Sequence, residues 1–123
     1  MSKQNFSVKQ RIKSFNFAFQ GLRTLLAEEH NSRIHLLATM IVLIAGFYFD
    51  IGQAEWLVLI ITIAIVFICE ILNTAMENIA DFISPDIHPS IKKIKDLAAA
   101  AVLISAIMSV VVGLIIFLPK LGF

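Results

Sequence analysis

Five polar side chains share one face of the helix predicted over residues 55–83, which is otherwise strongly apolar. They are Glu70, Asn73, Thr74, Glu77 and Asp81. At about 100° per residue, their spacing keeps all five within a sector about 100° wide. A carboxylate inside a bilayer costs at least ~2.5 kcal/mol on insertion scales, so an aligned row of them indicates a function. Such groups can accept a proton, bind a cation or line an ion path.

Depth along this helix predicts different tasks for its two glutamates. Counted from Trp56, Glu70 lies ~21 Å and Glu77 ~31 Å along the axis, against a hydrocarbon layer of ~30 Å. Glu70 is therefore expected in the hydrocarbon, where poor hydration makes a carboxylate a better proton acceptor for a lipid hydroxyl. Glu77 is expected at the water boundary, where it can hold Mg²⁺ on a nucleotide polyphosphate, because Mg²⁺ prefers carboxylate and phosphate oxygens.

Charged residues outside this helix can reach the same level. Glu28 and Glu29 end the first predicted helix, where solvated charge and metal binding are both open interpretations. Lys92, Lys93 and Lys95 can neutralise phosphate charge, as phosphoryl transfer requires. The chain has no GxxxxGK[ST] phosphate loop, so the residues alone leave lipid phosphotransfer and ion conduction equally open.

Three long apolar segments and one amphipathic segment must position these groups. Of the 123 residues, 59% are hydrophobic and 15% charged, which indicates an all-α membrane protein rather than a soluble domain. The predicted elements of a single domain over residues 1–123 are a surface helix at 5–29 and membrane spans at 31–50, 55–83 and 96–118. The spacing of apolar residues between Val8 and Leu26 predicts that the first helix lies in the interface.

The distribution of charge predicts the orientation. Nine of the ten Lys and Arg residues precede the first apolar run or lie between the second and third. By the positive-inside rule, the N-terminus and the predicted 84–96 loop face the cytoplasm, and the C-terminus faces outward. The segment 27–33 is expected to join the first helix to the first span, with Arg33 extending to the interface.

Other residues predict helix contacts. A stripe of small residues in the third span indicates close helix contact, and it consists of Ala101, Ser105, Ser109 and Gly113. Three helices are expected to leave the polar face of the second span open, so an oligomer is expected to cover it. His30, His35 and His88 are expected to be polar loop or interface residues, and the lone Cys69 a buried inert thiol.

Three motifs resemble the small integral-membrane bacterial diacylglycerol kinase family over nearly the whole chain. The first is GLR at Gly21–Arg23 followed by Glu29. The second is ExxNxxxExxxD from Glu70 to Asp81, and the third is KDxxxxAVL beginning at Lys95. The resemblance implies a lipid kinase of the bacterial inner membrane, a homotrimer with composite active sites near the cytoplasmic face.

The resemblance also implies a role for individual positions. Glu70 matches the general base and contacts the lipid substrate together with Ala99, while Glu29 and Glu77 match the Mg²⁺ and ATP ligands. The remaining implied ATP contacts are Arg11, Asn73, Asp86, His88, Lys95 and Asp96. Arg11 is included because Gln10 occupies the position of the family's arginine.

The expected partners are ATP, a lipid alcohol, the membrane and further copies of the chain, without nucleic acid. The runs Asn31–Leu36 and Asp86–Pro89 look like the branch that acts on undecaprenol. Diacylglycerol remains open as the acceptor. An ion or proton channel that uses the same carboxylates is the alternative from another class.

Overall fold

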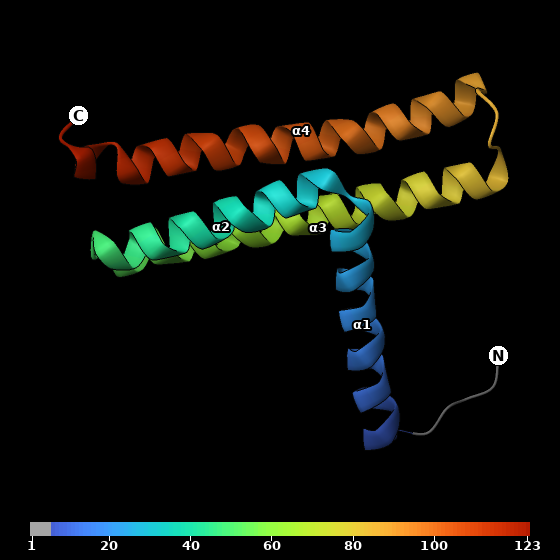
Figure 1. Cartoon of the computed structure of the whole chain (residues 1–123), viewed down its shortest axis with the longest axis horizontal. Coiled ribbons are helices and arrows are strands. Elements are labelled where there is room, and N and C mark those ends of the chain that lie inside the picture. The colour runs from blue at the N-terminus through green and yellow to red at the C-terminus, as the bar shows by residue number, and fades with distance from the viewer. Residues whose placement is uncertain (1–5) are drawn as a thin grey trace.

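A computed structural model describes residues 6–123, which form four α-helices and a short 3₁₀ helix (Figure 1). The elements are α1 (Val8–Glu28), α2 (His30–Tyr48), α3 (Gln53–Ile83), α4 (Pro89–Phe117) and η1 (Pro119–Leu121). Three stretches, His30–Tyr48, Gln53–Ile83 and Pro89–Leu121, are long and apolar enough to cross a membrane. The predicted all-helical architecture with three candidate spans is therefore confirmed. The predicted start of the first helix, residue 5, lies outside the described residues.

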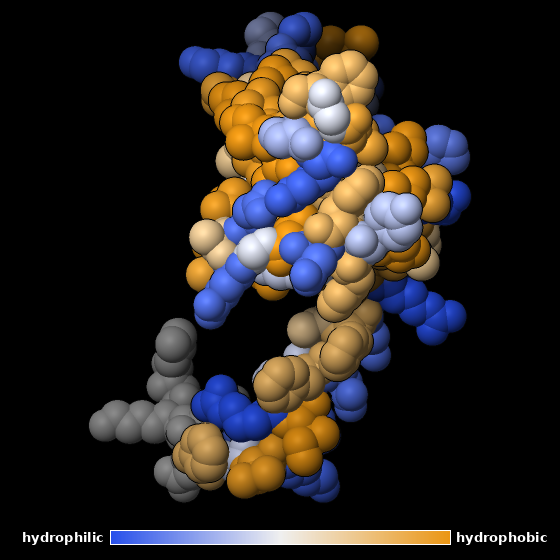
Figure 2. All heavy atoms as spheres, turned by 90° about the vertical axis from the view of Figure 1, so that its left-hand side faces the viewer, coloured by the Kyte–Doolittle hydropathy of each residue, from blue (hydrophilic) through white to orange (hydrophobic). Residues whose placement is uncertain are grey.

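The three long helices run along a common axis, and α1 leaves them crosswise (Figure 1). α3 packs mainly on α4, and α2 lies against α3. At one end of the bundle, Ile51, Leu59 and Ile116 form a small buried apolar cluster. Figure 2 looks onto this end, where polar atoms gather on the tip and apolar side chains surround it. Apolar side walls are what hydrocarbon requires of a spanning bundle.

A tight turn sets the antiparallel course of α2 and α3. Asp50 adopts a left-handed conformation with φ 50°, and the N–H of Ile51 returns to the carbonyl of Gly46 at 3.1 Å. This arrangement satisfies a free carbonyl at the end of α2 and reverses the chain at once. Across the turn, the ring of Trp56 packs over Gly46, where a Cβ atom would lie 2.6 Å from the indole.

The junction of α1 and α2 is a single residue, and most of the predicted joining segment 27–33 is helical. Only Glu29 interrupts the helices, as the C-cap of α1 and the N-cap of α2. Arg33 donates from Nε to the carbonyl of Leu26 (2.7 Å) and from Nη2 to that of Ala27 (2.8 Å). A cation is favourable at the free carbonyls and negative dipole end of α1, so Arg33 stabilises this junction.

The loop between α3 and α4 is also shorter than predicted. Helix α4 begins at Pro89, so the interpretation of residues 89–96 as an aqueous loop is wrong. The Nδ1 atom of His88 accepts a hydrogen bond from the N–H of Ser90 (3.1 Å), which caps the helix. Proline favours the first helical position, where its missing N–H removes no bond. The start of the third span at residue 96 stays a prediction, since a helix can continue past the bilayer.

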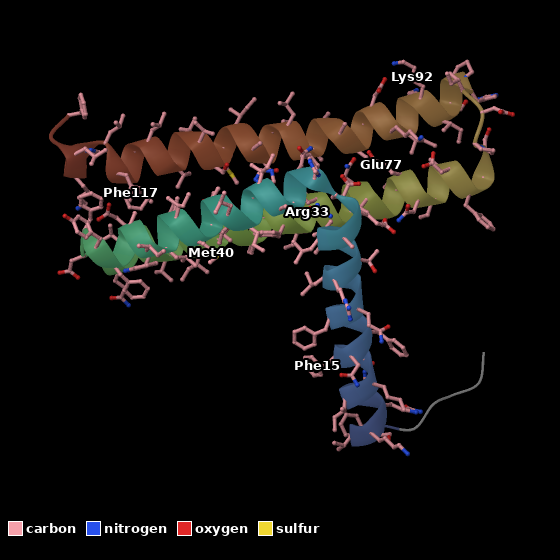
Figure 3. The ribbon with its side chains drawn as sticks, in the orientation of Figure 1. Phe15, Arg33, Met40, Glu77, Lys92 and Phe117 are labelled. Atoms are coloured by element: carbon pink, nitrogen blue, oxygen red, sulfur yellow. The ribbon has the colours of Figure 1, made fainter. Side chains whose placement is uncertain are left out.

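Several apolar side chains of α1 are exposed to solvent in the single chain. Phe15 and Phe19 are 66% and 67% exposed, and Figure 3 shows Phe15 standing out on α1 away from the bundle. Leu25, near the junction with α2, is the buried residue of this helix. The C-terminal end of α1 is held by the junction and by contacts with α3, where Asn78 donates to Glu28.

Candidate active site

Glu70 is buried at the centre of the polar face of α3, with 1% of its surface exposed. Asn73 and Thr74, one helical turn further along, are buried as well. From α4, Ser105 of the small-residue stripe is also buried. The expectation that only an oligomer could cover this face is wrong for these residues, because the helices of one chain cover them.

His35 on α2 is the polar neighbour of Glu70. Its Nε2 lies 3.1 Å from Oε1 of Glu70, which is an ion-pair distance. The contact lacks hydrogen-bond geometry, so both carboxylate oxygens are buried without a donor. Of the two expectations for His35, a loop or an interface position, the loop position is excluded, since His35 lies within a candidate span.

A signal for His35 was present in the sequence. If Glu29 lies opposite Glu77, as a shared metal requires, then antiparallel helices of equal rise bring residues 35 and 70 to nearly the same level. The structure follows this register: Asn78 donates to Glu28 at 3.4 Å, Glu29 faces Glu77, and His35 faces Glu70.

Glu29 and Glu77 are brought together at the junction of the helices. Their carboxyl groups lie close enough for the charge of one to act on the other, and Nδ2 of Asn73 donates to Oε1 of Glu77 at 3.4 Å. Figure 3 shows Glu77 on α3 beside the junction that carries Arg33. Two adjacent carboxylates repel one another unless a proton or a cation lies between them.

This pair of carboxylates fits Mg²⁺. Among residues 6–123, no group of three or more His, Cys, Asp or Glu side chains could enclose a metal. Mg²⁺ does not need such a cage, because it is usually bound by one or two carboxylates, substrate phosphates and water. Glu29 and Glu77 could thus hold the ion while leaving its other positions to a polyphosphate.

The predicted nucleotide contacts on α4 lie in ion pairs. Nζ of Lys95 is 2.5 Å from Oδ1 of Asp81, and its charge also acts on Glu77. Lys92 pairs with Asp96 at 2.6 Å. These groups are largely exposed, so each pair contributes little stability and either cation could turn to a phosphate instead.

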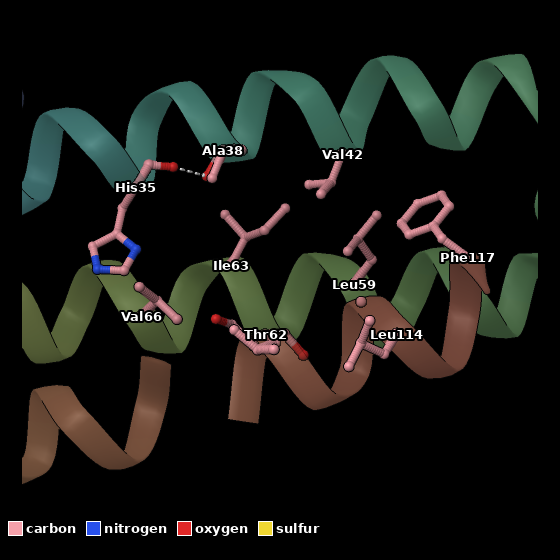
Figure 4. Close-up of a pocket in the computed structure, with 13 residues that line it drawn as sticks. His35, Ala38, Val42, Leu59, Thr62, Ile63, Val66, Leu114 and Phe117 are labelled. Atoms are coloured by element: carbon pink, nitrogen blue, oxygen red, sulfur yellow. Dashed lines mark hydrogen bonds between the residues drawn. The ribbon is translucent and has the colours of Figure 1, made fainter. Parts of the chain in front are cut away.

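A cavity of about 330 Å³ begins beside His35 and lies between α2, α3 and α4 (Figure 4). Thr39, Thr62 and Ser109 line it, but their hydroxyls donate to backbone carbonyls of their own helices. The walls are therefore effectively apolar. Such a space suits a hydrocarbon chain.

Comparison with known proteins assigns the family. The model of prokaryotic diacylglycerol kinase matches residues 16–117 of the chain. The chain belongs to this family. The undecaprenol kinase of Bacillus subtilis is 41% identical over 110 residues, which are 89% of each chain.

Two diacylglycerol kinases are also similar. That of Escherichia coli is 30% identical over 111 residues, 90% of this chain and 91% of the relative. That of Synechocystis is 37% identical over 109 residues, 88% of this chain and 62% of the relative. The predicted family and the prediction of a lipid kinase are confirmed.

Several residues that the family resemblance implies as ATP or lipid contacts lie away from the carboxylate pair of Glu29 and Glu77. Arg11 lies ~27 Å from Glu29 along α1, and its guanidinium sits 5.6 Å from the ring centre of Phe6. Asp86 and His88 lie in the exposed loop before α4. The Lys95–Asp81 contact shows how α3 and α4 are aligned, and by this alignment Ala99 lies nearer the level of Glu77 than that of Glu70.

Proposed function

We propose that this protein transfers the γ-phosphoryl group of ATP to the hydroxyl of a membrane lipid alcohol at the cytoplasmic side of the bilayer. The observation that carries this proposal is the position of the buried Glu70 two turns of α3 away from the paired carboxylates of Glu29 and Glu77. A base in hydrocarbon beside a cation site at the boundary suits a reaction between a lipid and a water-soluble nucleotide.

In this proposal, Glu70 accepts the proton of the lipid hydroxyl. The lipid oxygen then forms its bond to the γ-phosphorus while the bond from that phosphorus to the bridging oxygen breaks and ADP leaves. Glu29 and Glu77 would hold Mg²⁺, which neutralises phosphate charge when bound. Asn73 orients Glu77, and Lys95 and Asp96 contact the nucleotide.

We propose undecaprenol as the acceptor. The similar protein named undecaprenol kinase aligns with nearly the whole chain, and its identity exceeds that of the diacylglycerol kinases above. The apolar walls of the cavity beside His35 are compatible with either lipid.

The proposed setting is the bacterial inner membrane, with the N-terminus in the cytoplasm and the C-terminus outside. The crosswise course of α1 suits a helix that lies in the interface, with Phe15 and Phe19 in the acyl boundary and its basic residues at the headgroups. A homotrimer, which the family resemblance implies, is the proposed assembly.

The test is direct phosphate transfer. Purified protein in micelles is incubated with γ-labelled ATP, Mg²⁺ and either undecaprenol or diacylglycerol, and the lipids are extracted into organic solvent. Label in the undecaprenol fraction supports the proposal, and label in diacylglycerol alone changes the acceptor. Label that stays in water with both lipids would refute a lipid kinase activity of this chain.

A further inference from the structure

The contact between His35 and Glu70 has no role in the reaction described so far. The two side chains come from different helices, and they meet where Glu70 is 1% and His35 21% exposed. Within residues 6–123, His35 is the one basic side chain at ion-pair distance from Glu70. Every other recorded ion pair lies nearer an end of the bundle and is more exposed at its acid.

The surroundings of the imidazole contain few polar groups. The backbone carbonyl of His35 is taken up by the hydroxyl of Thr39 at 2.7 Å. From α4, the residues that face the same cavity are Ser109 and apolar side chains, none of which titrates. Arg33, two residues earlier on α2, is engaged at the end of α1. Glu70 is thus the titratable group that the ring of His35 meets.

A buried base needs a partner that holds it without neutralising it. A buried carboxylate that lacks a donor is strongly disfavoured, whereas a fixed lysine would stabilise the anion and weaken it as a base. A neutral imidazole offers one N–H and no net charge. A neutral histidine can therefore orient the carboxylate of Glu70 without making that carboxylate a weaker base.

We propose that His35 is a positioning residue for Glu70: its Nε2 lies 3.1 Å from Oε1, and a rotation of the neutral imidazole aligns Nε2–H with this otherwise unpartnered oxygen, so that Oε2 stays free for the lipid hydroxyl. This inference rests on the function proposed above. During the reaction the lipid O–H bond breaks and its proton moves to Oε2, while the oxygen–phosphorus bond forms and ADP leaves with the electron pair of the broken bond. His35 keeps its Nε2 proton throughout and holds the carboxyl group in one orientation.

Two substitutions separate orientation from volume. His35→Leu removes the donor, whereas His35→Gln keeps an N–H at a similar reach. We expect His35→Leu to lower kcat about 10- to 100-fold, a part of the effect of a positioned base, with the KM for ATP unchanged. His35→Gln should recover most of that loss. His30→Leu, at the exposed first position of the same helix, is the matched control.

A spectroscopic measurement tests the contact without turnover. In the ¹⁵N spectrum of histidine-labelled protein in micelles, the Nε2 signal of His35 should be that of a protonated nitrogen and should move in Glu70→Gln but not in Glu77→Gln. An Nε2 chemical shift of His35 that does not change in Glu70→Gln overturns the proposal. A His35→Leu enzyme with the kcat of the wild type overturns it as well.

The fold of each variant is checked by circular dichroism. If His35→Leu does not fold, a folded His35→Gln with a lost kcat overturns the proposal, and one with a retained kcat supports it. If the unaltered protein labels neither lipid, the proposed function fails, and the ¹⁵N spectrum still decides the contact by itself.

Discussion

The carboxyl groups of Glu29 and Glu77 face each other, although Glu29 precedes the first candidate span and Glu77 lies near the end of the second. The meeting depends on the one-residue junction at Glu29 and on the tight turn near Asp50, which together set the antiparallel register of α2 and α3. The same register brings His35 to Glu70. One structural feature therefore positions both the proposed cation site and the proposed base.

Glu70→Gln should abolish phosphate transfer while ATP still binds. The amide keeps the shape of the side chain but cannot accept the lipid proton, so we expect kcat to fall by about 10² to 10⁴. Initial rates with extracted lipid product give kcat, and equilibrium dialysis of labelled ATP gives binding. Loss of ATP binding in a folded Glu70→Gln variant would contradict the role of Glu70 as a base.

Glu77→Gln should weaken the binding of Mg²⁺-ATP as well as turnover, because it removes one of two carboxylates from the proposed cation site. Glu29→Gln should have a similar effect, and the double variant should lose less than the product of the two single losses, since both act on one ion. Titration with Mg²⁺ at fixed ATP measures the apparent affinity, and Glu28→Gln serves as the neighbouring control. Additive losses would indicate two separate sites.

Removal of the divalent cation should stop transfer reversibly. A chelator in excess over Mg²⁺ is expected to abolish lipid labelling, and restored Mg²⁺ should recover it, because the proposed carboxylate pair serves the reaction only with its ion. Circular dichroism should stay unchanged, since the helices are held by apolar contacts and backbone hydrogen bonds. Full activity under chelation would contradict the cation site.

Gly46→Ala should destabilise the protein. Its new Cβ would lie 2.6 Å from the Trp56 ring, so the indole or the turn must shift, at a cost of about 1–3 kcal/mol. Gly113→Ala is the matched control, because nothing lies within 4 Å of its new Cβ and alanine favours a helix. Thermal unfolding followed by tryptophan fluorescence measures both. Equal melting temperatures for the two variants would mean that Trp56 does not pack over Gly46.

Arg33→Leu should loosen the junction of α1 and α2. It removes the hydrogen bonds to the carbonyls of Leu26 and Ala27, which we expect to contribute about 1–2 kcal/mol together, given their exposure. Hydrogen exchange at the end of α1 should speed up, whereas Lys13→Leu, in the N-terminal part of the same helix, should leave that region unchanged. Protection that is equal in both variants would show that Arg33 does not hold the junction.

Several features of the candidate site were predictable because they depend on local chemistry. The apolar segments predicted three spans. The residue spacing in a helix by itself predicted that Glu70, Asn73 and Glu77 share one face. The family resemblance then assigned roles that the residues by themselves left open between phosphotransfer and ion conduction. Residues 89–96 are helical rather than a loop because Pro89 occupies the first position of a helix, where proline is favourable, and lysines are compatible with a helix.

The sequence by itself determined which elements are helical and which face of α3 is polar, because backbone hydrogen bonding and side-chain hydropathy repeat over a few residues. Only the tertiary structure decided what that face meets. His35 and Glu70 are joined by the register between two helices, and Arg33 is drawn to the end of α1 by the sharpness of one junction. These relationships depend on how rigid helices are set against each other, which no short window of sequence contains.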